Sequence, residues 1–451
     1  MSTLSFLSLS TLSLSTLPAN MADDLALGDD LRAFIDASPS PSHAVAELVR
    51  RLTDEGFGVL DEVDRWELAP GDRRFVVRND SSLIAFRVGS RPAAESGLRL
   101  IGAHTDSPTF KVRPHWDVRR SGYRLVGVEP YGGLLMHTWL DRELTVAGRV
   151  VLSGGETRLV RLSGAPLRLP SLAIHLDRSV RDKLTLDPQR QLVPVWSRDL
   201  GDEPGLIEAL AAELGVDAAD VIGHDLVLAD TQPAARSGAD ETWVAGPRLD
   251  DLACCHAGLL ALTGAEPAEH TELLVCNDHE EVGSGSMGGA RGSFLEDVLG
   301  RVVAATSEAD PQSLPRAIAR SRLVSADMAH AVHPTQGDRH EPDHTPEFGG
   351  GPVLKVNANQ SYATDAATGG WFARRCEEAG VAMQYFVSRA DLPCGSTIGP
   401  LTATRLGVAT VDVGAPMLAM HSCRELASAL DVPLMVRALT ACLEDGAVVA
   451  E

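Results

Sequence analysis

Histidine and acidic side chains follow short apolar runs at several widely separated points of this chain. Glu280 and Glu281, for example, come shortly after Leu273-Leu274-Val275, and one further acid opens an apolar helix. The set consists of His104, Asp250, Glu280, Glu281, Asp327 and His421. Imidazole nitrogens and carboxylate oxygens suit Zn²⁺, Mn²⁺ or Co²⁺. The residue types therefore predict a hydrolase site that holds two divalent metal ions bridged by one carboxylate.

Two further features of this set indicate catalysis as well as metal binding. Adjacent acids on an extended segment point to opposite sides, so one of Glu280 and Glu281 can bind metal while the other accepts a proton from water. Asp106 lies two residues after His104, where it can hydrogen-bond a metal-bound imidazole and orient it. Each residue alone has a plainer interpretation as a surface histidine, a helix N-cap or a solvated loop acid. Their coincidence at one place favours the metal site.

The elements that must position these residues form an α/β pattern. Strands are predicted at 75–78, 82–88, 98–103, 272–277, 322–326, 353–356, 383–387 and 408–413. Helices are predicted at 29–56 (broken at Pro39-Ser40-Pro41, with Ser42 as a cap), 250–262, 289–299, 364–378 and 432–443. Strands that alternate with helices predict a mostly parallel sheet. Because ligands bind outside the carboxyl ends of such strands, the topology brings the candidate ligands to one edge.

The sequence pattern of residues 109–244 differs from that of the rest of the chain. Short β-like segments at 150–152, 160–162 and 172–174 alternate with Gly, Pro and Arg turns, and one helix is predicted at 205–214. We interpret this stretch as an inserted, mainly β domain. The predicted layout is a disordered extension or mis-assigned start at 1–20, a catalytic domain in two parts (21–108 and 245–451), and the insertion between them.

Composition limits the classes of partner and compartment. A formal net charge of −22 over 451 residues argues against nucleic acid or anionic membrane as a partner. Seven cysteines without a CxxC pair predict reduced thiols and a cytoplasmic protein. The sequence contains no apolar run of about 18 residues, so it predicts no membrane-spanning helix. The Ser/Leu-rich start has no basic residue before Arg32, so Met21 is a plausible translation start.

Long ordered motifs in this sequence resemble peptidase family M18, the aspartyl aminopeptidase group, from about residue 30 to 443. The motifs are Gly102-Ala103-His104-Thr105-Asp106-Ser107-Pro108, Arg248-Leu249-Asp250-Asp251-Leu252, Asp278-His279-Glu280-Glu281-Val282-Gly283-Ser284, Ser325-Ala326-Asp327-Met328-Ala329-His330 and Met420-His421-Ser422. The resemblance implies an α/β dinuclear metallopeptidase that removes the N-terminal residue of short peptides. It also implies a preference for Asp or Glu at that residue.

The resemblance also implies residue roles. One zinc ion would be held by His104, Asp250 and Asp327, and the other by Asp250, Glu281 and His421, with Asp250 bridging. Glu280 would act as general base and then as general acid, and Asp106 would orient His104. His175 would reach the active site of a neighbouring protomer, and Lys355 would lie near the substrate. The implied assembly is a homo-oligomer built from dimers, of which a dodecamer is one form.

Two rival functions remain open on the sequence. One is a dinuclear amidohydrolase or carboxypeptidase that acts on N-acyl amino acids with the same metal chemistry. The other is a non-catalytic assembly or cargo-binding protein, against which an intact Glu280 and five ligands argue. The His-rich segment 329–344 offers a third metal site or, since Pro334, Gly337 and Pro342 interrupt it, a loop for ordering or assembly.

Overall fold

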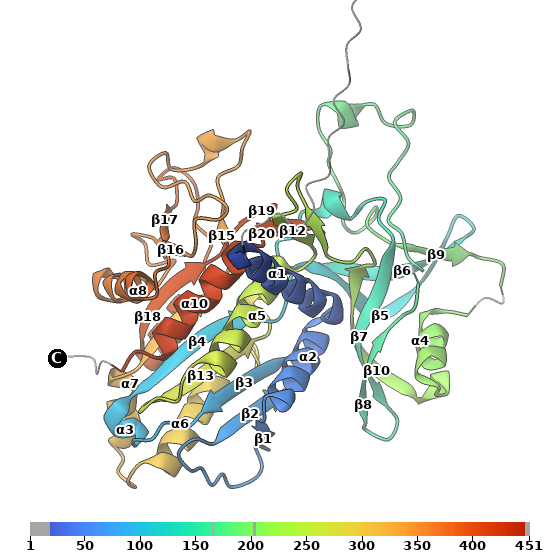
Figure 1. Ribbon diagram of the computed structural model, residues 1–451. Helices are drawn as coiled ribbons and strands as arrows, with labels where there is room; N and C mark the ends of the chain where they lie inside the picture. Colours follow the sequence, from blue (N-terminus) through green and yellow to red (C-terminus); the bar gives the residue numbers. More distant parts are fainter. Residues whose placement is uncertain (1–18, 165, 202–203, 447–451) are drawn as a thin grey trace, which may run out of the picture.

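A nine-stranded mixed sheet forms the centre of the molecule (Figure 1). The computed structural model describes residues 19–164, 166–201 and 204–446. The strand order is β1(Gly58–Val59), β2(Arg73–Arg78), β3(Ser82–Arg87), β13(Thr271–Asn277), β4(Leu98–His104), β14(Arg322–Ala326), β18(Ala409–Gly414), β16(Val353–Val356) and β17(Gln384–Val387). The stretch 1–20, which we expect to be a disordered extension or a mis-assigned start, lies outside the described residues except for its last two. These two residues begin α1(Ala19–Ala37).

The middle of this sheet is parallel. β4 pairs in parallel with β13 on one side and with β14 on the other, and β14 continues in parallel to β18. The pairs of β3 with β13 and of β16 with β18 are antiparallel. The predicted α/β class with a mainly parallel central sheet is therefore confirmed, and its parallel strands end at a common edge.

Both faces of the central sheet are buried, which explains the continuous apolar strands in the sequence. Along β4, Ile101 and Ala103 belong to one apolar core while Leu98 and Leu100 belong to the other. The first core is covered by α1, α2(Pro41–Asp54), α5(Leu249–Gly264), α8(Ala366–Glu378) and α10(Asp431–Leu443). The second is covered by α3(Ala93–Ser96), α6(Phe294–Thr306), α7(Ser313–Ala319) and α9(Ile398–Leu406).

Three local predictions were wrong, each for a physical reason. Ser40 rather than Ser42 caps α2, because Pro41 takes the first helical turn, where a missing N–H has no consequence. The helix expected from 289 begins at Phe294, since the preceding loop packs backbone against backbone. The segment 172–174 forms no strand, and Leu172 and Ile174 are exposed.

Two smaller sheets lie beside the central one (Figure 1). The larger is antiparallel, in the order β8(Thr157–Arg161), β7(Leu144–Leu152), β10(Val221–Asp230), β5(Thr109–Arg120), β6(Tyr123–Tyr131), β9(Val195–Arg198), with α4(Leu206–Leu214). The other has the order β11(Ala235–Ser237), β12(Trp243–Gly246), β20(Glu425–Ser428), β19(Pro416–Leu418), β15(Ala329–His330). The antiparallel sheet encloses its own apolar core. Among the described residues, no helix is long and apolar enough to cross a membrane.

Candidate metal centre

The predicted ligands converge on the edge where the parallel strands end. His104 is the last residue of β4, and Asp327 follows β14 directly. Glu280 and Glu281 lie in a short 3-10 turn, η5(Glu280–Val282), just after β13. His421 arrives differently from the expectation, because β19 of the smaller sheet separates it from β18.

Asp250 lies at the centre of this cluster. Its Oδ1 is 3.6 Å from Nε2 of His104, and its Oδ2 is 3.5 Å from Nε2 of His421. The same His421 nitrogen is 3.3 Å from Oε1 of Glu281. Donor atoms of His104, Asp250 and Asp251, and of Asp250, Glu281 and His421, lie within 4.8 Å of one another. One carboxylate therefore faces two imidazoles through its two different oxygens.

The residues present fit bound divalent cations. Oδ1 of Asp250 and Oε1 of Glu281 are buried and have no hydrogen-bond partner within the described residues. A buried carboxylate oxygen without a partner is costly, and a bound cation would offset that cost. The nitrogen and oxygen donors are those that zinc and manganese accept.

The electrostatics of the cluster lead to the same conclusion. Burial raises the pKa of Glu280 to about 8 and that of Glu281 to about 7, and neighbouring carboxylates add to both shifts. Burial lowers the pKa of His421, but contact with Asp250 and Glu281 outweighs burial and raises it to about 11. The cluster thus has an excess of buried acid, which favours bound positive charge.

Asp106 holds the turn that carries the two glutamates. Its Oδ1 accepts a hydrogen bond from the Glu280 amide (3.0 Å), and its Oδ2 accepts from the Glu281 amide (3.1 Å) and the Tyr131 hydroxyl (2.7 Å). Towards His104, Nδ1 lies 3.0 Å from the main-chain oxygen of Asp106 and 3.5 Å from its carboxylate. Sequence spacing indicated only the contact with the imidazole and missed the support of the turn.

Two further buried acids position the ligands and were not selected from the sequence. Oδ2 of Asp251 accepts from the His104 amide at 3.1 Å. Glu425 accepts from the amides of Asp250 (3.1 Å) and His421 (2.6 Å), so it joins the backbones of two candidate ligands. For Asp251 the signal was its place beside Asp250, whereas Glu425 gave none, because its partners are distant in sequence.

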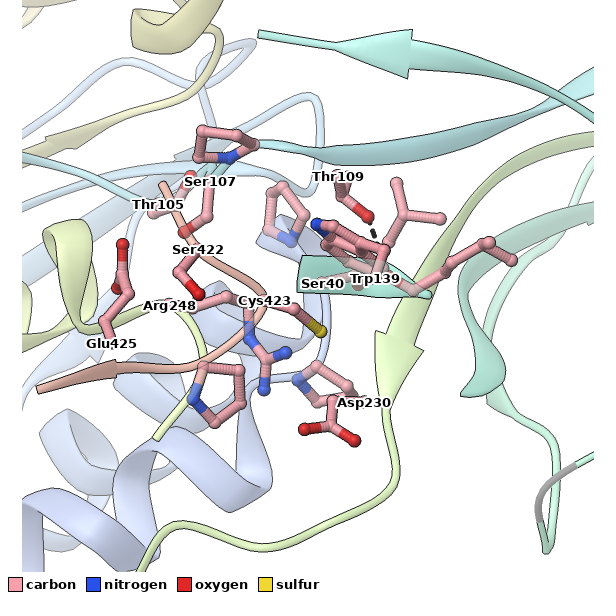
Figure 2. A pocket seen from close by; sticks show the side chains of 16 residues that line it. Ser40, Thr105, Ser107, Thr109, Trp139, Asp230, Arg248, Ser422, Cys423 and Glu425 are labelled. Carbon is pink, nitrogen blue, oxygen red and sulfur yellow. Dashed lines mark hydrogen bonds between the residues drawn. The ribbon is translucent and has the colours of Figure 1, made fainter. Parts of the chain in front are cut away.

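A small cavity of about 20 Å³ lies beside Glu425 (Figure 2). Ser107, Arg248 and Glu425 are among the side chains around it. The Ser107 hydroxyl donates to the Asp250 carbonyl at 2.6 Å. Arg248 donates to the carbonyls of Ser38 (2.9 Å) and Ile35 (3.2 Å) and so fixes the entry to α5. The Asp250 backbone is therefore held from both sides.

Asp327 is held by a buried lysine. Nζ of Lys355 donates to Oδ1 of Asp327 at 3.1 Å, and the lysine side chain is only 3% exposed. Burial lowers the lysine pKa, but the Asp327 carboxylate outweighs burial and raises it above its ordinary value, so the charge is permanent. A side chain at Gly414 would put its Cβ 1.9 Å from the Asp327 carbonyl, so this glycine allows the close approach.

A cavity of about 450 Å³ opens over the cluster. It is lined by all six candidate metal-site residues (His104, Asp250, Glu280, Glu281, Asp327, His421) and by Lys355, His330, Tyr362 and Phe386. His175 does not line it: this residue is exposed, in the segment that leads away from β8. In the His-rich segment, His340 accepts from the His333 amide and His344 contacts Glu341, so these side chains have protein partners.

A mainly parallel α/β sheet with a histidine–carboxylate cluster at its carboxyl edge defines a metal-dependent hydrolase. The family model for aminopeptidase I zinc metalloprotease (M18) matches residues 34–442. The chain belongs to peptidase family M18, whose members are metallo-aminopeptidases.

Relatives and solved structures agree with this family. A probable M18 family aminopeptidase 2 of Pseudomonas aeruginosa is 48% identical over 423 residues, covering 92% of this chain and 97% of the relative. The cryo-EM structure of the Ape4 and Nbr1 complex matches with TM-score 0.91 and 36% identity, covering 95% of this chain and 87% of that one. The S. cerevisiae mApe1 dodecamer matches with TM-score 0.83 and 26% identity, covering 94% and 98%.

The support of Asp106 by Tyr131 is testable. Tyr131→Phe removes a donor from a buried carboxylate, so we expect the free energy of unfolding to fall by about 1–3 kcal/mol and turnover to fall with it. Chemical denaturation and steady-state kinetics measure the two effects. Tyr385→Phe is the matched control, because Tyr385 is 48% exposed and its hydroxyl forms no hydrogen bond with any described residue. Unchanged stability and turnover in Tyr131→Phe would contradict the assigned role.

Proposed function

We propose that this M18 aminopeptidase works with two divalent cations per chain, most simply Zn²⁺, with Mn²⁺ or Co²⁺ as alternatives. The observation that carries the proposal is the placement of Asp250, whose two carboxylate oxygens face His104 and His421 separately. A bridging carboxylate needs this arrangement, since each oxygen must serve a different ion. The unpartnered oxygens of Asp250 and Glu281 support it.

The proposed ligand sets share that aspartate. His104, Asp250 and Asp327 would hold one ion, and Asp250, Glu281 and His421 would hold the other. Lys355 would limit how far the Asp327 charge neutralises its ion, because one oxygen of that carboxylate already accepts from the ammonium group. Asp106, Asp251 and Glu425 would fix the ligands by hydrogen bonds to their backbone amides.

Bound cations would polarise the scissile carbonyl and lower the pKa of the attacking water. Glu280 would take the proton from that water and pass it to the leaving nitrogen. Glu280 lines the cavity, and its amide is fixed by the Asp106 carboxylate. The Glu280 carboxylate can therefore serve both the attacking water and the leaving nitrogen from one position. The substrate's free N-terminal amine would bind beside the site carboxylates, which limits cleavage to the first residue.

The role of Glu280 predicts a separation of metal binding from turnover. Glu280→Gln keeps the size and packing but removes the proton acceptor, so we expect kcat to fall by roughly 10²–10⁴-fold with the metal content unchanged. Enzyme kinetics and elemental analysis of the purified protein provide the two readouts. Glu377→Gln, at an exposed position of α8, should leave both unchanged. Full turnover in Glu280→Gln would contradict the proposed role of Glu280, whereas full retained function of this variant without turnover would revive the interpretation of the chain as a non-catalytic assembly protein.

An acidic N-terminal residue is the proposed preference, with Lys355 as the local cation. Its ammonium has three donor hydrogens, of which the described contacts use one, on Asp327. The others can reach a carboxylate in the cavity that Lys355 lines. Because the whole chain carries a net charge of −22, only a local cation can attract such a substrate.

A panel of Asp-, Glu-, Leu- and Lys-aminoacyl substrates, with matching N-acetylated forms, tests this preference. We expect release from the Asp and Glu members, loss of activity with a chelator, and recovery on addition of Zn²⁺, Mn²⁺ or Co²⁺. Release that favours Leu would keep the mechanism and remove the acidic preference. Cleavage of the acetylated forms alone would identify an N-acyl amidohydrolase instead, because an aminopeptidase needs a free amine.

We also propose that residues 109–244 act as an inserted dimerisation domain and that the working form is a homo-oligomer built from such dimers. His175 would then complete the active site of a neighbouring protomer and steady the oxyanion of the tetrahedral intermediate. Its exposed position on a segment with exposed Leu172, Ile174 and Leu176 supports this, because apolar side chains in such numbers favour a protein contact. The dodecameric form of the yeast relative supports a closed assembly.

Mixing two inactive variants tests the contribution from a neighbour. His175→Ala and Glu280→Gln should each lose most activity as pure oligomers. Co-assembled chains should regain part of it, since some sites combine an intact Glu280 with an intact His175 from the neighbour. Recovery is measured after co-expression with two affinity tags, against each variant alone. Full activity of the pure His175→Ala oligomer would contradict the proposal.

A further inference from the structure

The loop between η5 and α6 forms one wall of the active-site cavity beside Glu280. Gly283 and Arg291 of this loop line the cavity together with Glu280 and Glu281. The Ser284 amide donates to the His279 carbonyl at 2.7 Å, and the Arg291 amide donates to the Ser284 carbonyl at 3.2 Å. The loop therefore folds back on the turn that carries Glu280 and returns Arg291 to the same wall.

The position of the Arg291 backbone is fixed on both sides. Its carbonyl accepts from Nη1 of Arg405 at 2.9 Å, and Nη2 of Arg405 is paired with Glu296 at 2.7 Å. Within the loop, a Cβ at Gly289 would lie 2.3 Å from the Ser284 carbonyl, which leaves room only for glycine. Close backbone packing of this kind restricts the position of the Arg291 backbone, and therefore the point from which its side chain extends.

The guanidinium of Arg291 is nevertheless without a partner. Arg291 is exposed, and among the described residues its side chain forms neither a hydrogen bond nor an ion pair. An arginine side chain without an acidic partner is unusual here, because the chain has 62 acidic and 40 basic residues and the cavity is lined with carboxylates. The ammonium group of Lys355, which also lines the cavity, already donates a hydrogen bond to Asp327. Arg291 thus extends an unneutralised donor fork from a fixed backbone position at the cavity wall.

The position of Arg291 relative to Glu280 indicates which part of a peptide it meets. Glu280 delivers its proton to the leaving nitrogen, so the part of the substrate that leaves extends along the wall formed by the Glu280 turn and its loop. Lys355, His330 and Tyr362 lie on other segments of the lining, around Asp327. On the wall beside the scissile bond the neighbouring side chains, Glu280 and Glu281, are acidic, so a carboxylate carried by the leaving part needs a cation there, and a guanidinium binds such a group through two hydrogen bonds.

We propose that Arg291 binds a carboxylate on the leaving side of the scissile bond, and so selects short peptides that carry negative charge directly after the cleaved residue. The group is the terminal carboxylate of a dipeptide or an acidic side chain of the second residue, which share the same chemistry. This inference rests on the proposed aminopeptidase mechanism. It assigns specificity to the second residue, separately from the preference for the first.

Three substrates with the same N-terminal residue X, taken from the panel above, separate the two sources. They are X-Gly, X-Gly-amide and X-Asp-amide, of which the second has no carboxylate after X. In Arg291→Gln we expect KM to rise about five-fold for a carboxylate-bearing substrate, with kcat unchanged and X-Gly-amide unaffected. A rise for X-Gly alone identifies the terminal carboxylate, and a rise for X-Asp-amide alone identifies the side chain. The effect should shrink at high ionic strength.

Arg316→Gln is the matched control, because Arg316 is also exposed, forms no side-chain contact and lies outside the cavity on α7. An equal change in KM for all three substrates, or no change for any, would overturn the proposal. A shift in the oligomeric state of Arg291→Gln on size-exclusion chromatography would also overturn it, since Arg291 would then serve an interface. Failure of the wild-type protein to cleave any member would reject the aminopeptidase mechanism itself, a result distinct from these.

Discussion

Buried negative charge at the carboxyl edge of the central sheet is the constraint around which this molecule is organised. Several carboxyl groups lie where water is largely excluded, and burial raises the pKa of Glu280 and Glu281 well above that of an ordinary glutamate. Such a cluster is costly unless each oxygen finds a hydrogen donor or a cation. Divalent metal ions answer this requirement, and the unpartnered oxygens of Asp250 and Glu281 are where they would bind.

The surrounding structure supplies the hydrogen donors that the cations do not. Backbone amides serve Asp106, Asp251 and Glu425, and the lysine ammonium serves Asp327. Because the amide donors belong to Glu280, Glu281, His104, Asp250 and His421, each acid that accepts from them also fixes the backbone of a site residue. Charge neutralisation and geometric precision are therefore provided by the same contacts, which is the usual function of groups that surround metal ligands.

The central fold and the residue types of the candidate site could be predicted from the sequence. Apolar strands followed by acids and histidines indicated a buried, mainly parallel sheet, and β14 and β16 lie at the predicted residues. The ligand types were readable for the same reason, since a position just after a strand fixes a residue at the sheet edge irrespective of its other contacts. The helix predicted at 364–378 is α8, which begins at Ala366 and is capped by Asp365 in a capping box with Thr368.

How those residues are held, and which side chains lack a partner among the described residues, depends on contacts between distant segments of the chain. Glu425 binds the backbone of Asp250, which lies 175 positions away, and no local pattern encodes such a contact. The same holds for the pairing of Lys355 with Asp327 and for the absence of a strand at 172–174, where exposed apolar residues mimic a buried segment. Sequence patterns report local backbone preference and burial, whereas hydrogen-bond partners are set by which distant segments the fold brings together.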